Sequence, residues 1–145
     1  MDYLLNLAHR PPVVIPPDAT VLQAVELMSS SRVGAVAVVA AERLVGIFTE
    51  RDLMERVVLK TREASTTKVG EVMTAPVESV HPNDDPERAL EQMIDHHIRH
   101  LPVTDDSDHI LGMLSIRNLL QDRLEKARRE AESLEAYISA DGPGG

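Results

Sequence analysis

Two short stretches of the chain carry side chains whose types and spacing could bind a ligand. "GIFTERD" contains Thr49 and Asp52, and "GMLSIRN" contains Ser115 and Asn118 at the same spacing. A hydroxyl residue that ends a strand and begins a helix lies beside unpaired backbone N–H groups at the positive end of the helix, which favours a bound phosphate. A carboxylate three residues later only accepts hydrogen bonds, so it could take both hydroxyls of a ribose. Each stretch therefore indicates a possible nucleotide contact.

The same spacing has a second interpretation. A Thr or Ser followed three residues later by a polar acceptor is also a capping box, which closes the start of a helix without any ligand. One hydroxyl can serve a cap and a ribose together, so the two interpretations do not exclude each other. Arg51 and Arg117 lie inside the two stretches, where they could add charge-assisted hydrogen bonds to a phosphate.

The two stretches differ in their last residue. Asn118 has one acceptor oxygen and two donor hydrogens, whereas Asp52 offers two acceptor oxygens. A hydrogen bond to a charged group contributes about 1.5–3 kcal/mol, against about 0.5–1.5 kcal/mol for a neutral one. We therefore predict that a cleft formed around Asp52 binds ribose more strongly than one formed around Asn118.

Both stretches belong to an internal repeat that covers most of the chain. Matching residues lie 65 positions apart at first, and 66 positions apart after one residue is inserted in "TDDSDHI". Identical pairs at these offsets are Pro11/Pro76, Pro17/Pro82, Ala24/Ala89, Glu26/Glu91, Met28/Met93, Val38/Val103, Gly46/Gly112, Arg51/Arg117 and Leu53/Leu119. Halves of about sixty residues are too small to bury a sizeable core alone, so we expect them to pack together with pseudo-two-fold symmetry.

Each half predicts the same order of elements, β-α-β-β-α, and the fold class is therefore α/β. A short extended stretch comes first ("PVVIP" and "PVESVHP"), followed by a helix for which Asp18 and Asn83 are the predicted N-caps. Two apolar runs joined by a polar turn then predict a hairpin, and a second helix follows. The expected divisions are 1–65, 66–121 and a C-terminal charged helix with its tail at 122–145.

The order of elements, the segments "GEVMTAPVESVHP" and "IRHLPV", and the G-h-h-[ST]-x-x-[DN] ending of each hairpin resemble the CBS-domain pair, also called a Bateman module. The resemblance runs from about Leu4 to about Gln121, and it is to the stand-alone bacterial type with a charged C-terminal helix. It implies two related clefts between the halves that hold adenosine compounds such as AMP, ATP, NADH or S-adenosylmethionine. It also implies a regulatory role without catalysis, and pairing of two copies into a disc-shaped dimer.

The resemblance assigns ligand contacts to residues in both halves. They are Val14, Gly34, Ala35, Thr49, Arg51, Asp52, Ser79, Arg99, His100, Pro102, Ser115, Arg117 and Asn118. Arg99 and His100 are expected beside the second cleft, the one formed around Asn118, where the first half has Gly34 and Ala35. Arg99 suits a phosphate, although it could equally be a solvated cation at a helix end.

Composition narrows the possible functions. A formal charge of −9 argues against a broad nucleic-acid footprint, and the chain has no cysteine for a disulfide, a zinc thiolate or a nucleophile. No stretch of 18 apolar residues and no signal peptide is present, so we expect a cytoplasmic protein without a membrane span. The histidines in "DHHIRH" lack a partner ligand, so no metal site is predicted. No nucleophile lies beside a base, so no catalytic residues are predicted either.

The stretch "LLQDRLEKARREAESLEAYISA" predicts a helix with an apolar seam at heptad spacing. The seam residues are Leu120, Leu124, Ala127, Ala131, Leu134 and Ile138. Two alternatives remain open from the sequence: the seam pairs with another chain, either a second subunit or a partner protein, or it docks back on its own domain. "ADGPGG" is expected to end the helix in a frayed tail.

These observations predict a regulatory module that binds an adenine nucleotide, with AMP or ATP favoured, and that requires no cofactor. It is expected to form a homodimer and to act on a separate partner protein, because no catalytic constellation is present. One alternative is a ligand-free module for dimerisation or protein interaction. Another is a CBS pair that binds S-adenosylmethionine or NADH.

Overall fold

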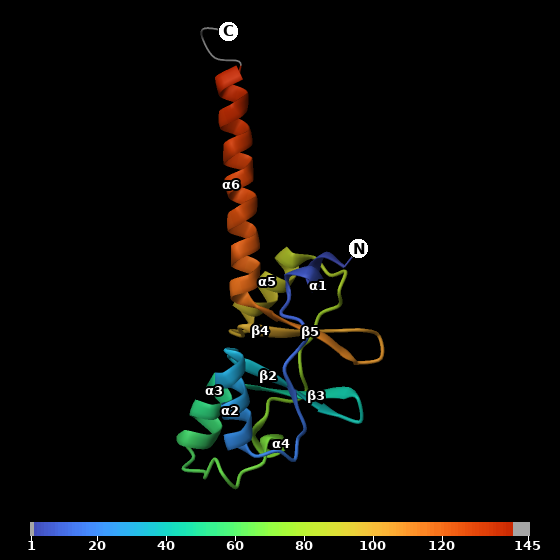
Figure 1. Ribbon diagram of the computed structural model, residues 1–145, viewed down its shortest axis with the longest axis vertical. Coiled ribbons are helices and arrows are strands. Elements are labelled where there is room, and N and C mark those ends of the chain that lie inside the picture. The colour runs from blue at the N-terminus through green and yellow to red at the C-terminus, as the bar shows by residue number, and fades with distance from the viewer. Residues whose placement is uncertain (1, 141–145) are drawn as a thin grey trace.

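The computed structural model describes residues 2–140, which form two similar halves and a long C-terminal helix (Figure 1). The first half contains β1 (Val14–Ile15), α2 (Val21–Ser31), β2 (Ala35–Ala40), β3 (Arg43–Thr49), α3 (Glu50–Asp52) and η1 (Leu53–Val58), and it is followed by α4 (Val69–Val72). The second half contains α5 (Pro86–Asp95), β4 (His100–Thr104), β5 (Ile110–Ser115) and α6 (Ile116–Ala140), and α1 (Tyr3–Leu7) precedes the first half.

The order β-α-β-β-α is confirmed, with one difference in the second half. In the first half β2 pairs with β1 in parallel and with β3 in antiparallel orientation. In the second half β4 and β5 form the same hairpin, but the expected first strand is reduced to a single parallel bridge between Val80 and Val103. The surrounding "PVESVHP" contains two prolines, which cannot donate to a strand ladder.

The predicted helix caps were wrong by a few residues. The N-cap of α2 is Thr20, whose hydroxyl accepts from the Gln23 N–H at 3.1 Å while the Gln23 side chain accepts from the Thr20 N–H at 2.9 Å. The N-cap of α5 is Asp85, directly before Pro86. A complete capping box and a proline at the first helical position fix these helix starts more firmly than Asp18 or Asn83 could.

Alternating side chains divide each sheet between two environments. In β2, Val36 and Val38 pack with Phe48 against the helices of the first half, whereas Ala35 and Ala37 face the other half. In the second half the core on the helix side is formed by Leu4, Val80, Ala89, Leu90, Met93, Leu101, Val103, Leu114 and Leu119. The period of two along a strand therefore builds one core in each half and a thin apolar layer between the sheets.

The segment that leads into each half pairs with the sheet of the other half. His9, which follows α1, pairs with Met113 of β5, and Thr74, which follows α4, pairs with Ile47 of β3. Gly46 and Gly112 allow these segments to approach. A Cβ at Gly46 would collide with the Met73 side chain, and one at Gly112 would lie 3.1 Å from the Ala8 Cβ. The two halves are therefore interlocked.

Helix α6 continues directly from the second half, and its outer part stands clear of the body (Figure 1). It runs without interruption from Ile116 to Ala140, so the charged stretch extends the second helix of the repeat. No helix within residues 2–140 is long and apolar enough to cross a membrane. The predicted frayed tail lies outside the described residues.

Candidate functional site

A cleft of about 400 Å³ lies between the two halves. It is lined by Gly34, Ile47, Thr49, Glu50, Arg51, Asp52 and Met54 of the first half, by Thr74, Pro76, Val77 and Glu78 of the connecting segment, and by His97, Ile98, Arg99 and His100 of the second half. This volume falls within the range of small-molecule sites, and the mixture of apolar walls with a few polar groups is typical of them.

Asp52 is buried at the edge of this cleft, and its carboxylate is already bonded to the protein. Its Oδ2 accepts hydrogen bonds from the Thr49 N–H at 3.0 Å and the Thr49 hydroxyl at 3.2 Å. Its Oδ1 accepts from the Thr74 hydroxyl at 2.9 Å and lies 3.6 Å from the Arg56 Nε. The Asp52 N–H in turn donates to the Thr49 hydroxyl, so the capping interpretation holds in full.

The second stretch forms the same cap with a neutral residue. The Asn118 Oδ1 accepts from the Ser115 N–H at 3.0 Å and from its hydroxyl at 2.8 Å, and the Asn118 N–H donates back to the Ser115 hydroxyl. The change from Asp to Asn therefore preserves the cap, because a cap needs only one oxygen. The second oxygen of Asp52 accepts the hydrogen bond from the Thr74 hydroxyl, and Thr74 lies on the segment that leads into the second half.

Arg99 and His100 lie in the Asp52 cleft, and their predicted place beside the Asn118 cleft was wrong. The approach of His100 to Gly34 shows the reason, since a Cβ on this glycine would lie 3.3 Å from the His100 ring. Gly34 directly precedes β2 and His100 begins β4, so the starts of these two strands meet between the halves and the start of β4 faces the first half. Aligning the repeats shows which residues of the two halves are equivalent. It does not show which residues meet in a cleft, because this cleft joins different positions of the two repeats.

Two arginines approach the cleft from opposite halves. Arg51 lies at the start of the first-half helix, and its Nη1 donates to the backbone carbonyl of His97 at 3.2 Å. Arg99 immediately precedes β4. The Arg51 contact is a direct polar link between the halves at the cleft, and the Arg51 Nε also lies 3.9 Å from the Glu55 carboxylate. A guanidinium group has five N–H donors, so Arg51 keeps donors for an anionic ligand beside these contacts.

The remaining predicted contact residues lie elsewhere. Ala35 and Pro102 have almost no exposed surface, and Ser115 and Asn118 form their own cap. Val14, Ser79 and Arg117 are exposed outside the lining of this cleft.

Sequence reasoning missed two acidic residues and one hydroxyl of the cleft. Glu50 and Glu78 line it beside Asp52, and Thr74 binds the Asp52 carboxylate. Glu50 directly follows the recognised Thr49, so its position next to a helix start was a usable signal. Glu78 and Thr74 lie in the segment that leads into the second half, and no local pattern places that segment against the first half.

Within residues 2–140 no group of three or more His, Asp or Glu side chains is arranged to hold a metal ion. His96 instead contacts Glu78 through its Nδ1, and Glu78 also accepts from the Gln92 side chain at 3.1 Å.

Comparison with known proteins places this architecture in a family. The family model described as "CBS domain" matches residues 5–59 and again residues 69–125. The chain belongs to the CBS-domain family. Its two matches correspond to the two halves of the structure, so the chain is a CBS pair, a regulatory ligand-binding module.

Three proteins illustrate the similarity of this CBS pair to known ones. The mitochondrial CBS domain-containing protein CBSX3 of Arabidopsis thaliana is 37% identical over 126 residues, which are 83% of this chain and 61% of that protein. The crystal structure of the CBS domain NE2398 has a TM-score of 0.79 at 36% identity, covering 85% of this chain and 95% of that one. The CBS domain protein PAE2072 of Pyrobaculum aerophilum, complexed with AMP, has a TM-score of 0.73 at 29% identity, covering 80% and 88%.

The pH dependence of this CBS pair is expected to involve His100. Burial lowers the pKa of His100 below the ordinary value of 6.5, Glu50 opposes this shift, and Arg99 reinforces it. The unfolded chain therefore binds a proton at higher pH than the folded chain does, so the contribution of neutral His100 to stability is complete above pH 6.5 and declines as the pH falls below it.

We expect the His100→Gln variant to lose stability less steeply than the wild type between pH 6.5 and about pH 5. Urea unfolding at several pH values measures this difference, with His9→Gln as the control because the His9 side chain is exposed. Equal pH slopes for His100→Gln and the wild type would contradict the expectation.

Proposed function

We propose that this CBS pair is a regulatory module whose cleft binds an adenosine compound with a single phosphate, of the AMP class. The observation that carries the proposal is the meeting of Arg51 from the first half with Arg99 from the second in one cleft. A phosphate between two guanidinium groups would tie the halves together, while Ile47, Val77 and Ile98 supply apolar surface for a base.

The charge of the cleft favours a monophosphate over a triphosphate. Three carboxylates, those of Glu50, Asp52 and Glu78, line the same space as the guanidinium groups of Arg51 and Arg99. With neutral histidines the formal charge of the lining is therefore slightly negative. A triphosphate would bring several further negative charges into this surface, whereas one phosphate can lie between the two arginines. This narrows the predicted AMP or ATP to the AMP class.

Ribose recognition by Asp52 would require Thr74 to move. The Asp52 Oδ2 already accepts two hydrogen bonds, and the Oδ1 accepts one from Thr74. A carboxylate oxygen has two lone-pair directions, so two ribose hydroxyls cannot both bind while Thr74 keeps its bond. Rotation of the Thr74 hydroxyl away from Asp52 would free a lone pair and couple ligand binding to the segment between the halves.

The Pyrobaculum aerophilum protein supports this ligand class, because its structure is a complex with AMP and its similarity extends over 80% of this chain. S-Adenosylmethionine and NADH share the adenosine group and remain alternatives within the same cleft. The regulated protein is proposed to be a separate chain. The binding signal would be transmitted through a change in the relative positions of the two halves.

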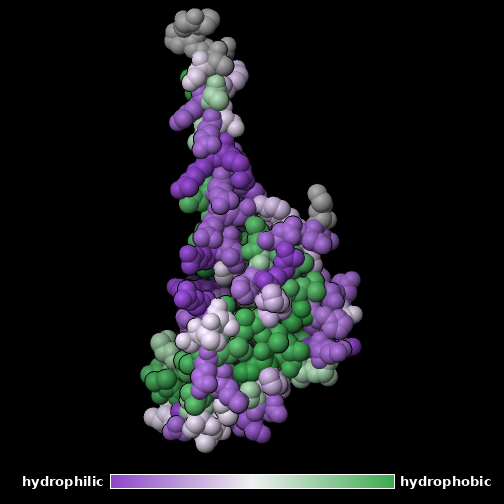
Figure 2. Space-filling view, viewed as in Figure 1, coloured by the Kyte–Doolittle hydropathy of each residue, from purple (hydrophilic) through white to green (hydrophobic). Residues whose placement is uncertain are grey.

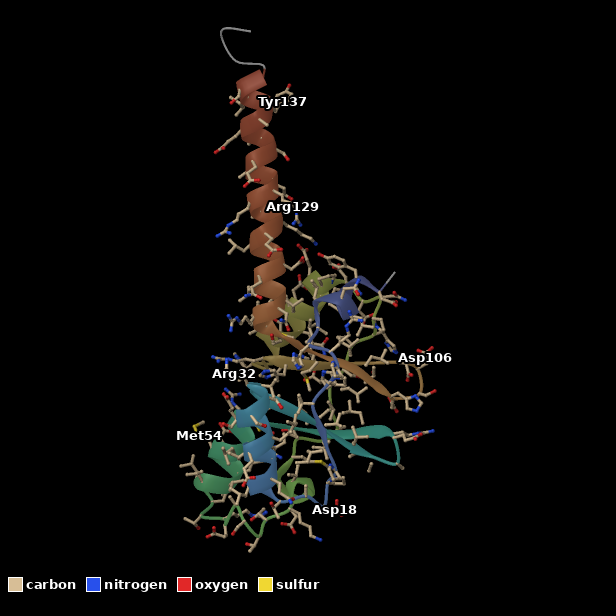
Figure 3. All side chains as sticks on the ribbon, viewed as in Figure 1. Asp18, Arg32, Met54, Asp106, Arg129 and Tyr137 are labelled. Carbon is tan, nitrogen blue, oxygen red and sulfur yellow. The ribbon has the colours of Figure 1, made fainter. Side chains whose placement is uncertain are left out.

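A homodimer is proposed from apolar surface that both halves expose at equivalent positions. Met54 and Val58 on the first half are 53% and 63% exposed, and their repeat counterparts Leu120 and Leu124 are 50% and 53% exposed. Figure 2 shows the apolar surface at the lower left of the body, where Figure 3 labels Met54. A second copy would cover surface on both halves.

A titration with nucleotides tests the proposed ligand. We expect AMP to bind to the purified protein with higher affinity than ATP in calorimetry, and Arg99→Ala to weaken AMP binding by about tenfold to a hundredfold, because a hydrogen bond to a charged group is lost. Arg88→Ala is the matched control, since Arg88 is an exposed arginine of α5 outside the cleft. The panel includes ADP, NADH and S-adenosylmethionine.

The competing function is a ligand-free interaction module. It is favoured by the observation that both motifs form complete caps without any ligand. No binding of any adenosine compound to a folded, dimeric protein would support this function and contradict the sensor. Binding that is unchanged in Arg99→Ala would leave a sensor but would remove this cleft as its site.

A further inference from the structure

The outer part of α6 carries an apolar seam that no part of residues 2–140 covers. Ala127, Ala131, Leu134 and Ile138 form this outer seam, and the two larger side chains are 60% and 59% exposed. Figure 3 shows the helix between the labelled Arg129 and Tyr137 standing clear of the body. The alternative that α6 docks back on its own domain is therefore wrong for this part of the helix.

The body holds α6 by a different face from the one that carries the outer seam. Leu119 is buried in the core of the second half, the Tyr3 hydroxyl donates to the Asp122 Oδ1 at 2.5 Å, and the Lys126 Nζ lies 4.7 Å from the centre of the Tyr3 ring. Residues three or four apart lie on one face of a helix, so these contacts share a face. With 3.6 residues per turn, the outer seam lies roughly 120° around the helix from these contacts, and its exposed side chains are open to another helix.

The charges beside the seam argue against a parallel pair of α6 helices. In heptad terms Ala131 and Ile138 are a positions, and Ala127 and Leu134 are d positions. In a parallel coiled coil, the residue at a g position of one helix faces the residue at the following e position of the other helix. This would place Arg123, which forms an ion pair with Glu87 at 3.0 Å, against Arg128 of the second copy, and Glu130 against Glu135. Both contacts join like charges. Parallel pairing would also set alanine against alanine in two layers between leucine layers, which leaves space unfilled.

An antiparallel pair removes both conflicts. When Ala131 faces Leu134 of the second copy, Ala127 faces Ile138, so every layer of the outer seam joins a small side chain to a large one. In an antiparallel pair, e positions of one helix face e positions of the other. Arg128 and Glu135 are both e positions, so this alignment sets Arg128 against Glu135 of the second copy. Two-fold symmetry forms that ion pair twice.

We propose that the outer seam binds the outer seam of a second copy of this chain in antiparallel orientation. In this arrangement the two bodies lie at opposite ends of the helix pair. Leu120 and Leu124 are not part of these four layers, so in this proposal a different copy covers the apolar surface of the body. The assembly is therefore expected to be larger than a dimer at high protein concentration.

Disulfide cross-linking tests the orientation, since the chain has no cysteine of its own. An equimolar mixture of Ala127→Cys and Ile138→Cys, one of them tagged, is expected to give the mixed disulfide dimer under mild oxidation. Ile138→Cys alone should give little dimer, because the two copies of position 138 in an antiparallel pair are far apart. The matched control is a mixture of Arg129→Cys and Glu132→Cys on the outward face. A dimer of Ile138→Cys alone, or a mixed yield no higher than the control, overturns the proposal.

Charge reversal at Arg128 gives a second test, because it should weaken association in an antiparallel pair and strengthen it in a parallel pair. Arg128→Glu places a second carboxylate against Glu135 in the antiparallel pair, and we expect association in sedimentation equilibrium to weaken by about tenfold. Combining it with Glu135→Arg should restore association. In a parallel pair the new carboxylate of Arg128→Glu would instead meet Arg123 and strengthen association. Stronger association of Arg128→Glu, or no change in both variants, contradicts antiparallel pairing.

Discussion

Replacing Phe48 with alanine is expected to lower the free energy of unfolding by about 3–5 kcal/mol, the usual cost of removing a buried phenylalanine side chain. Phe48 is fully buried, and it is the single phenylalanine of the chain. On the adjacent strand it pairs with Val36, and both belong to the core between the sheet and the helices of the first half. The cavity left behind would lie among side chains fixed by a strand ladder, which limits collapse.

Urea unfolding measures this cost, and the interlocked halves predict a single transition. The control is Leu59→Ala, because Leu59 is 69% exposed and should change stability by less than about 0.5 kcal/mol. The core of the first half also supports α3 and η1, so Phe48→Ala should weaken ligand binding as well. A loss below about 1 kcal/mol, or two separate transitions, would show that the cores do not unfold together.

Asp52→Ala is expected to cost about 3 kcal/mol, more than any other single change at the candidate site. The substitution removes the acceptor for the Thr49 N–H and leaves the Thr74 hydroxyl without its partner. It also removes the carboxylate that the Arg56 guanidinium approaches at 3.6 Å. Asp52 thus joins the helix start of the first half to the segment that leads into the second.

Asp52→Asn separates the cap from the charge. An asparagine oxygen can accept from Thr49 as Asn118 does from Ser115, so this variant should lose only about 1 kcal/mol. Asn118→Ala, which removes the equivalent cap, should also lose about 1 kcal/mol. Denaturant unfolding of the three variants measures the order, and equal losses for Asp52→Ala and Asn118→Ala would contradict it. Because Asp52→Asn keeps the fold, it is also the variant with which to test whether Asp52 strengthens ribose binding.

Several features of the fold were predictable because they depend on local pattern. The two hairpins follow from apolar runs separated by a polar turn, and the helix starts at Thr49 and Ser115 follow from a hydroxyl with an acceptor three residues later. The pairing of the halves followed from their small size. The caps at Thr20 and Asp85 were also readable, since Gln23 completes a capping box and Pro86 marks a first turn.

The composition of the cleft was less predictable because it depends on contacts between distant segments. Arg99 and His100 face Asp52 only because two strand entries meet between the halves. Thr74 reaches Asp52 only because the connecting segment crosses to the sheet of the other half. Each contact joins residues more than twenty positions apart, and hydrophobic periodicity carries no information about such pairs.

The sequence by itself determined the repeat, the family resemblance, the motif residues and the heptad seam, because each is a pattern of residue types at fixed spacing. Only the tertiary structure decided that the motifs form complete caps, that Arg51 and Arg99 share one cleft, and that the outer seam of α6 remains exposed. The physical reason is that a capping box and a ribose contact use the same side chains, and a docked helix and a free one use the same seam. Only the positions of neighbouring groups decide between them.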